Sequence, residues 1–200
     1  MKKFKVSKLL TSGLISLVII VAITYAFLNS PEKNSYMDKL NNMNNFSSAS
    51  WMVYANSVDE LIDLSDLIVE GKVVDYKPRI NGKLVFTDEI VEVKKVLKGN
   101  VNEGDQITVV VTGGELKGMT TAPIEDCPIM DFRGNYMLFL KTNDGVKYAI
   151  IGGNQGFGLI KNNKIEVTQK GGLGVTFSDY KIDEMEKDIK SYMSKVSKID

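Results

Sequence analysis

The chain of 200 residues contains no histidine and a single cysteine, Cys127. Without histidine it lacks the commonest general base, the histidine-activated serine and cysteine nucleophiles, and the usual zinc ligands. One cysteine cannot form an intramolecular disulfide. Because free cysteine is among the most buried residue types, we expect Cys127 in the core, with pairing between chains or a reactive thiol as the alternative. These absences favour a protein that is not an enzyme.

Charge of either sign is also not concentrated in the way that nucleic-acid binding requires. The 25 basic and 25 acidic residues give a formal net charge of zero. Nucleic-acid surfaces need a concentrated basic face, which the sequence does not show, so no nucleic-acid partner is predicted. Nor does the sequence assign any catalytic residue, cofactor or metal site.

The long apolar run near the start is the most informative segment. Lys2, Lys3, Lys5 and Lys8 precede an uncharged stretch over residues 9–28. Twenty helical residues rise about 30 Å, which matches the hydrocarbon core of a bilayer. The run therefore predicts one transmembrane helix in contact with the lipid bilayer. The positive-inside rule places residues 1–8 in the cytoplasm and the rest of the chain outside the cell membrane.

A cleaved secretory signal is the alternative interpretation of this run. Residues 24–26, Thr-Tyr-Ala, resemble a small-residue cleavage site, and cleavage would release the protein. The apolar stretch is long for a signal, however, and this site lies inside the stretch. The sequence therefore favours a retained anchor.

After the anchor, a polar tether is predicted over residues 29–56, rich in asparagine and serine. One extracytoplasmic domain follows over residues 57–200. It begins with a capping box, Ser57-Val58-Asp59-Glu60, which predicts a short helix over 58–65. Near the end, apolar residues at three- and four-residue spacing predict a helix of about fifteen residues. These residues are Ile182, Met185, Ile189, Tyr192, Met193 and Val196.

Between the two helices, short apolar and β-branched runs predict strands. We expect a first strand over 67–76 with a bulge at Gly71, and a long bent or bulged strand over 83–97. Further strands are expected over 107–112, 136–141, 146–151, 157–160 and 164–167, with hairpin turns at 143–145 and 161–163. A loop is expected from Gly113 to Arg133. The domain is therefore predicted to be mainly β, with its strands closed into an antiparallel barrel.

The order of the strand patterns resembles a known family. Asp66-Leu67-Ile68-Val69-Glu70-Gly71-Lys72-Val73 is followed by Val93-Lys94-Lys95-Val96-Leu97-Lys98-Gly99 and by Gly134-Asn135-Tyr136-Met137-Leu138-Phe139. These patterns are similar to the OB-fold of netrin modules and tissue inhibitors of metalloproteinases. They also resemble membrane-anchored or secreted proteins of low-GC Gram-positive bacteria. The resemblance spans residues 66–141 and implies an OB-like barrel. The inhibitors' N-terminal metal-chelating cysteine is absent here.

Three kinds of segment carry patterns that could indicate chemistry. Ser30-Pro31-Glu32-Lys33 matches an S-x-x-K pattern without its companion motifs, and residues 152–158 and 171–174 are glycine-rich without a phosphate-loop lysine. The carboxylates of 125–131 suit calcium only weakly, because their spacing matches no calcium loop. If the domain binds a ligand, loops 113–115 and 125–131 are the first places to look.

Taken together, the sequence predicts a membrane-anchored extracellular module that binds a protein or an envelope partner. An inhibitor or modulator of an extracellular protease is the alternative, implied by the resemblance. A carboxylate-dependent envelope hydrolase is the third hypothesis, and it requires a pair of facing carboxylates.

Overall fold

The computed structural model describes Leu40 and residues 53–142, 144–166 and 180–198. All of these lie in the second of two compact units, Met37–Asp200, the first being Met1–Tyr36. The basic segment 1–8, the predicted anchor 9–28 and nearly all of the predicted tether therefore lie outside the described residues. Within the described part of the chain, no helix is long and apolar enough to cross a bilayer.

The domain begins at Ala55, whose backbone is hydrogen-bonded to the side chain of Gln155. The Ala55 amide donates to Oε1 of Gln155 at 3.1 Å, and Nε2 of Gln155 donates to the Ala55 carbonyl at 2.9 Å. Ala55 is buried, whereas Val53 and Tyr54 just before it are exposed. Gln155 lies in a short 3-10 helix, η1 (Gly153–Gln155), and its side chain is itself buried. This pair of hydrogen bonds fixes the point at which the chain enters the domain.

Helix α3 (Val58–Leu64) confirms the predicted short helix. The Ser57 hydroxyl accepts from the Glu60 amide at 3.1 Å, as the capping box requires. The return contact differs from the prediction, because the Glu60 carboxylate accepts from the amide and the side chain of Asn56 at 2.7 and 2.9 Å. The first turn of α3 is therefore capped at two successive residues.

Strands β1 (Leu67–Asn81) and β2 (Leu84–Lys98) form one long antiparallel ribbon. The bulge predicted at Gly71 is confirmed by a register shift between Glu70 and Gly71. A Cβ at Gly71 would lie 2.4 Å from Cγ1 of Val91, so this close approach requires glycine. The first strand runs five residues beyond its predicted end. It then turns at Asn81-Gly82, where Gly82 has a φ of 61°.

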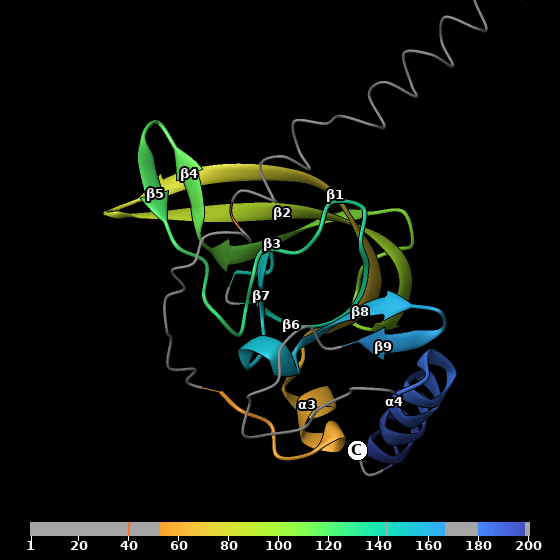
Figure 1. Cartoon of the computed structure of the whole chain (residues 1–200). Helices are drawn as coiled ribbons and strands as arrows, with labels where there is room; N and C mark the ends of the chain where they lie inside the picture. Colours follow the sequence, from red (N-terminus) through yellow and green to blue (C-terminus); the bar gives the residue numbers. More distant parts are fainter. Residues whose placement is uncertain (1–39, 41–52, 143, 167–179, 199–200) are drawn as a thin grey trace, which may run out of the picture. The chain divides into compact units, whose positions relative to one another are not determined.

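Five strands pair in a ring (Figure 1). Strands β3 (Gln106–Thr112), β6 (Asn135–Thr142) and β7 (Lys147–Ile150) join β1 and β2 in the order β1-β2-β3-β7-β6, and β6 pairs with β1 again. The predicted all-antiparallel arrangement is wrong at one pairing, since β3 and β7 run parallel. Their pairing joins Thr108 and Val109 to Lys147 and Tyr148, which are distant in sequence.

Two further hairpins extend from the ring. Strands β8 (Phe157–Lys161) and β9 (Lys164–Glu166) continue the sheet beyond β6, with Asn162 and Asn163 at positive φ as predicted for this turn. Strands β4 (Gly114–Leu116) and β5 (Met119–Thr121) form a separate hairpin inside the segment predicted as a loop. In Figure 1 this hairpin stands beside the far ends of β1 and β2.

Helices α3 and α4 (Ile182–Val196) cover the outer side of β1 and β6. Ile68 on β1 and its partner Phe139 on β6 belong to one apolar cluster with both helices. Their neighbours Leu67, Val69, Leu138 and Leu140 point to the opposite side, and they are also buried. Because β1 and β6 are covered on both faces where they pair, residues 67–69 of β1 and 136–140 of β6 are continuous apolar runs rather than alternating ones.

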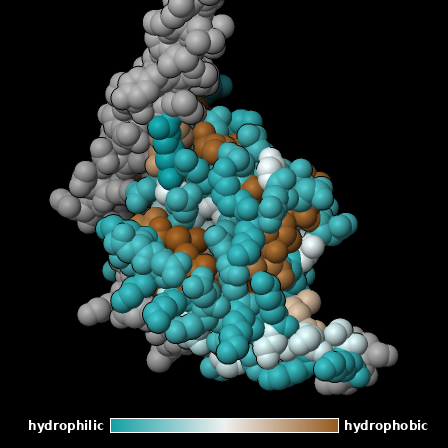
Figure 2. All heavy atoms as spheres, turned by 90° about the vertical axis from the view of Figure 1, so that its right-hand side faces the viewer, coloured by the Kyte–Doolittle hydropathy of each residue, from teal (hydrophilic) through white to brown (hydrophobic). Residues whose placement is uncertain are grey.

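The apolar stripe predicted for the last helix is confirmed in its first half. Ile182, Met185 and Ile189 are buried, while Tyr192 and Met193 are partly buried against the same cluster. Figure 2 views the molecule from the right-hand side of Figure 1 and shows a mostly hydrophilic surface with scattered apolar patches. The described domain thus buries apolar side chains both between the ring and the helices and on the opposite side of β1 and β6.

Candidate functional site

The outer face of β2 and β3 carries the best candidate for a binding site. Side chains alternate along a strand, so Phe86, Asp88 and Ile90 lie on one face of β2. Their partners on β3 are Thr112, Val110 and Thr108. This face is opposite to the one that carries Thr87, Glu89 and Val91, and on it Asp88 and Ile90 are themselves buried, whereas Phe86 is partly exposed. We call the outer surface around Asp88, with Arg79, Phe86 and Lys147, the Asp88 face.

One carboxylate binds two cations from different strands on this face. Oδ1 of Asp88 accepts from Nε of Arg79 on β1 at 2.8 Å, and Oδ2 accepts from Nζ of Lys147 on β7 at 2.6 Å. Burial opposes ionisation of Asp88, but the hydrogen bonds from Lys147 and Arg79 outweigh burial and lower its pKa. The Arg79 guanidinium also lies over the Phe86 ring, 5.1 Å from its centroid.

Positive charge is in excess around the Asp88 face. Arg79 and Lys147 share one carboxylate, and both keep more than a third of their side-chain surface exposed. Lys77 and Lys83 lie on the same ribbon and are exposed, and no acidic residue occurs from Tyr76 to Thr87. An anionic ligand would therefore meet cations already ordered by Asp88, at low entropic cost.

A second carboxyl, Glu89, is enclosed in the domain. It is fully buried on the face of β2 that also carries Val91, and it pairs with Val109 of β3. Its Oε1 accepts from the Met130 amide at 2.7 Å, whereas Oε2 has no hydrogen-bond partner within the described residues. Burial raises the pKa of Glu89 well above its usual range, against the effect of the Met130 amide. Burial therefore favours the neutral form of the Glu89 carboxyl.

The loop over Glu89 is the segment 125–131 that the sequence singled out. Cys127, Ile129 and Met130 are buried, which confirms the prediction for the cysteine. Burial raises the pKa of the Cys127 thiol, so it is not an activated nucleophile. The Tyr76 hydroxyl donates to the Met130 carbonyl, and the Tyr136 hydroxyl accepts from the Asp131 amide. This loop closes over the domain interior rather than forming an open site.

A third cluster lies beneath α4. Glu70 on β1 and Glu186 on α4 share a hydrogen bond between their carboxyl groups, and Lys95 on β2 pairs with both. Burial and the contact with Glu186 raise the pKa of Glu70 to about 7, against the charge of Lys95. Burial also opposes ionisation of Glu186, but its hydrogen bonds to Lys95 and Glu70 outweigh burial and lower its pKa.

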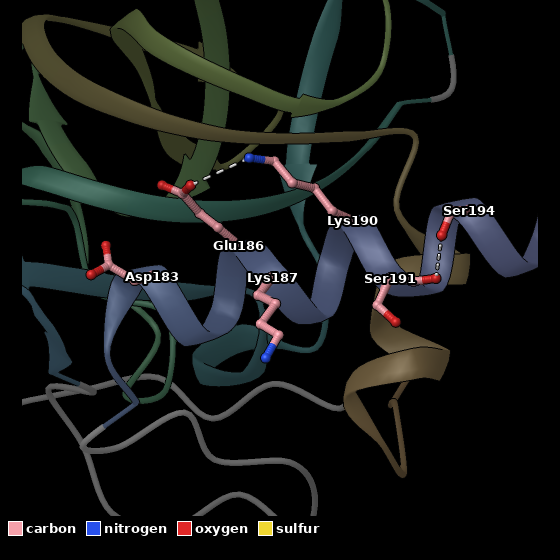
Figure 3. Close-up of a pocket in the computed structure, with 6 residues that line it drawn as sticks. All are labelled: Asp183, Glu186, Lys187, Lys190, Ser191 and Ser194. Carbon is pink, nitrogen blue, oxygen red and sulfur yellow. Dashed lines mark hydrogen bonds and ion pairs between the residues drawn. The ribbon is translucent and has the colours of Figure 1, made fainter.

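A shallow depression of about 660 Å³ adjoins this cluster (Figure 3). It is lined by one side of α4 alone, from Asp183 to Ser194, and Lys190 lies 3.8 Å from Glu186 across it. Glycoside hydrolases hold their two carboxyl groups roughly 5 to 9.5 Å apart, with room for substrate or water. In contrast, Glu70 and Glu186 contact each other directly and bind Lys95. The arrangement joins α4 to the β1–β2 ribbon.

The other candidate segments from the sequence do not converge on these clusters. Residues 113–115 lead into β4, the glycines of 152–158 surround η1, and residues 30–33 and 171–174 lie outside the described residues. Among the residues described, no group of three or more acidic or cysteine side chains is placed to hold a metal ion. The sequence patterns did not single out the Asp88 face, because residues 86–91 place one carboxyl and apolar side chains on each face of the strand.

Comparison with known proteins adds no assignment. No family model matches the chain, and no curated protein matches it.

Proposed function

We propose that this chain is a non-enzymatic binding module held at the cell membrane by an anchor over residues 9–28. Residues 57–200 lie outside the cell in this proposal, as an OB-like barrel with its two helices. The ring of five paired strands supports the barrel, because an OB-fold is a five-stranded, partly open barrel. Were the N-terminal segment cleaved, the same module would be secreted.

The partner that we propose is an anionic polymer of the cell envelope. The observation that carries this proposal is the Asp88 face, where Arg79 and Lys147 share one carboxylate and more cations surround them. In OB-folds the face of strands 2 and 3 and the adjoining loops bind extended polymers. Here the corresponding outer face of β2 and β3 carries Asp88, with Arg79 and Lys147 reaching it from the neighbouring strands.

The absence of histidine and the buried Cys127 support binding over catalysis. The joint pairing of Glu70 and Glu186 with Lys95 supports a structural role for these two carboxyl groups. No feature of the described residues favours a protease inhibitor in particular, so an envelope polymer is the better-supported partner.

The test is a titration of the full chain, in detergent micelles, with a fluorescent glycerol-phosphate polymer. Anisotropy is expected to rise with this polymer and not with neutral dextran, and the affinity should fall steeply as salt is added. Replacing both Arg79 and Lys147 with alanine should weaken binding about tenfold or more. The matched control replaces Lys161 and Lys164 with alanine, on the β8–β9 hairpin, and should bind as the natural chain does.

A second variant, Asp88→Asn, gives a result of opposite sign. It removes the carboxylate that neutralises Arg79 and Lys147, so affinity for the anionic polymer should increase. Equal binding to dextran, or an equal loss in the Lys161 and Lys164 control, would contradict the proposed partner. Binding of a protein from the cell surface to the Asp88 face, without polymer binding, would assign the module to a protein partner instead.

A further inference from the structure

Two hairpin tips at one side of the domain combine exposed aliphatic side chains with lysine. The first tip is the turn from Ile80 to Leu84, and the second is the turn from Leu116 to Met119. Each has a glycine next to a lysine at its turn, in the sequences Gly82-Lys83 and Lys117-Gly118, with Gly82 and Gly118 both at positive φ.

The two hairpins are fixed to one another. The Val85 amide donates to the Thr121 hydroxyl at 2.8 Å, and the Gly113 amide donates to the Val85 carbonyl at 3.0 Å. The Thr87 hydroxyl donates to the Gly113 carbonyl at 2.8 Å. Strands β4 and β5 also contact β1 and β2 directly, and both tips lie at the left of Figure 1. The tips are therefore held as one rigid corner of the domain.

Their composition is unusual for a hairpin turn facing water. Ile80 and Leu84 are 40% and 46% exposed, on opposite faces of the ribbon, and Leu116 and Met119 are partly exposed. Neither tip contains an acidic residue, and each contains a lysine. Aliphatic side chains beside lysines, without acids, match the boundary between lipid headgroups and acyl chains, because lysine keeps its ammonium in water while its stem lies along apolar surface.

We propose that these two hairpin tips dock on the surface of an anionic lipid bilayer. This rests on the proposed function, in which the anchor places the domain beside the membrane. The 24 residues between the predicted anchor and Val53 extend to at most about 80 Å, so the domain stays within that distance of the bilayer. Because the anchor already holds the chain at the bilayer, binding of the tips to the same bilayer is an intramolecular event. Even a weak contact of the tips is then occupied.

A bilayer fits these tips better than the polymer proposed for the Asp88 face. A soluble polyanion pairs with the cations and leaves Ile80 and Leu84 in water. A membrane surface pairs with the lysines and also removes the aliphatic side chains from water. Lys83 and Lys117 are each expected to contribute about a fivefold change in occupancy on anionic membranes.

The test places a fluorescent dye at the first tip of the full chain. Cys127→Ala removes the natural thiol, Asn81→Cys carries the dye, and the chain is reconstituted into vesicles that contain lipids with nitroxide quenchers near the headgroup. The dye should be quenched with about 30% anionic lipid and much less in zwitterionic vesicles. A dye at Lys161→Cys, on the β8–β9 hairpin, should be quenched in neither.

Variants distinguish docking through the two tips from non-specific adhesion of the whole domain to vesicles. Ile80→Ser with Leu84→Ser should lower the tip quenching about tenfold on anionic vesicles, with unchanged circular dichroism. The matched control, Val146→Ser, removes an aliphatic side chain that is 70% exposed at the β6–β7 turn, and should leave quenching unchanged.

The outcomes distinguish this inference from the function on which it rests. An unquenched tip dye on chains that float with the vesicles overturns the docking and leaves the anchored module intact. Equal quenching at Lys161→Cys, or in zwitterionic vesicles, also overturns it. Chains that do not float with either kind of vesicle overturn both the docking and the anchor. A loss of polymer affinity in the tip variants, without quenching, would assign the tips to the polymer site.

Discussion

Asp88 and Glu89 are neighbours on β2, yet their carboxyl groups lie in opposite environments. Asp88 faces outward between Arg79 and Lys147, and the pKa of its carboxyl is lowered. Glu89 faces inward, fully buried, with one oxygen unpartnered among the described residues and its pKa raised. A strand separates successive side chains onto two faces, so one residue step decides between a carboxylate paired with two cations and an enclosed carboxyl that burial disfavours as an anion. Substitutions that remove either carboxyl test this difference.

The largest effect is expected at Glu89. Glu89→Ala leaves a cavity and an unpaired Met130 amide, and should lower the free energy of unfolding by about 2–4 kcal/mol. Glu89→Gln keeps an acceptor for that amide and should cost less than half as much. Denaturant unfolding at pH 7 measures both. Equal losses in the two variants would mean that the hydrogen bond to Met130 does not hold the loop.

Glu89 also predicts how stability depends on pH. Its pKa is higher in the folded than in the unfolded state, so its contribution is complete below the usual glutamate pKa and is lost as pH rises through the folded value. Glu89→Gln should therefore flatten the decline of stability as pH rises above the usual glutamate pKa. As a second readout, the buried Cys127 in the loop over Glu89 should react with a thiol reagent faster in Glu89→Ala than in the natural chain. An unchanged labelling rate would show that Glu89 does not limit the access of the reagent to the Cys127 thiol.

Glu70 lies between Glu89 and Asp88 in its environment, because it is half-buried and also has charged neighbours. Its pKa of about 7 exceeds the usual value, so the folded state is favoured at low pH and loses stability as pH rises toward 7. Glu70→Gln should therefore stabilise the domain at pH 8 by about 1 kcal/mol, after allowance for solvent screening. At pH 4 the two proteins should unfold at nearly the same denaturant concentration. A destabilised Glu70→Gln at pH 8 would contradict the assigned contact with Glu186.

The smallest effect on stability is expected at Asp88. Its lowered pKa gives the opposite sign, so its contribution is present above the usual aspartate pKa and is lost as pH falls through the folded value. Because the pairs with Arg79 and Lys147 are partly exposed, Asp88→Asn should cost only about 0.5 kcal/mol at pH 7. Thermal unfolding between pH 3 and pH 7 measures the difference. A loss as large as that of Glu89→Ala would show that the outer face is structural rather than available for binding.

Local patterns predicted much of this fold. Ser57 marked the start of α3, Gly71 marked the bulge in β1, and the spacing of Ile182, Met185 and Ile189 marked α4. The Asn81-Gly82 turn was missed although asparagine-glycine between apolar residues is a strong hairpin signal. The parallel pairing of β3 with β7 has no local signature, since it joins segments about forty residues apart.

The sites were harder to predict than the strands. Arg79 and Asp88 meet through the β1–β2 hairpin, but Lys147 reaches Asp88 only because β7 pairs in parallel with β3. Likewise Glu70, Lys95 and Glu186 meet because α4 packs on β1. Single residues in one sequence carry no signal of such convergence. The sequence therefore did not indicate which carboxyl groups would lie together, as the hydrolase hypothesis requires. The contact between Glu70 and Glu186 became clear only from the fold.

The double hydrogen bond between Ala55 and Gln155 has a mechanical consequence. A chain that is anchored upstream and bound to the cell envelope through its domain transmits tension at Ala55. That tension first meets two hydrogen bonds and then the short helix α3, which is seven residues long. Behind them, β1 is bonded to β2 along one edge and to β6 along the other. In a module anchored and bound as proposed, these two hydrogen bonds and α3 would be the first to yield, ahead of the doubly bonded strand β1.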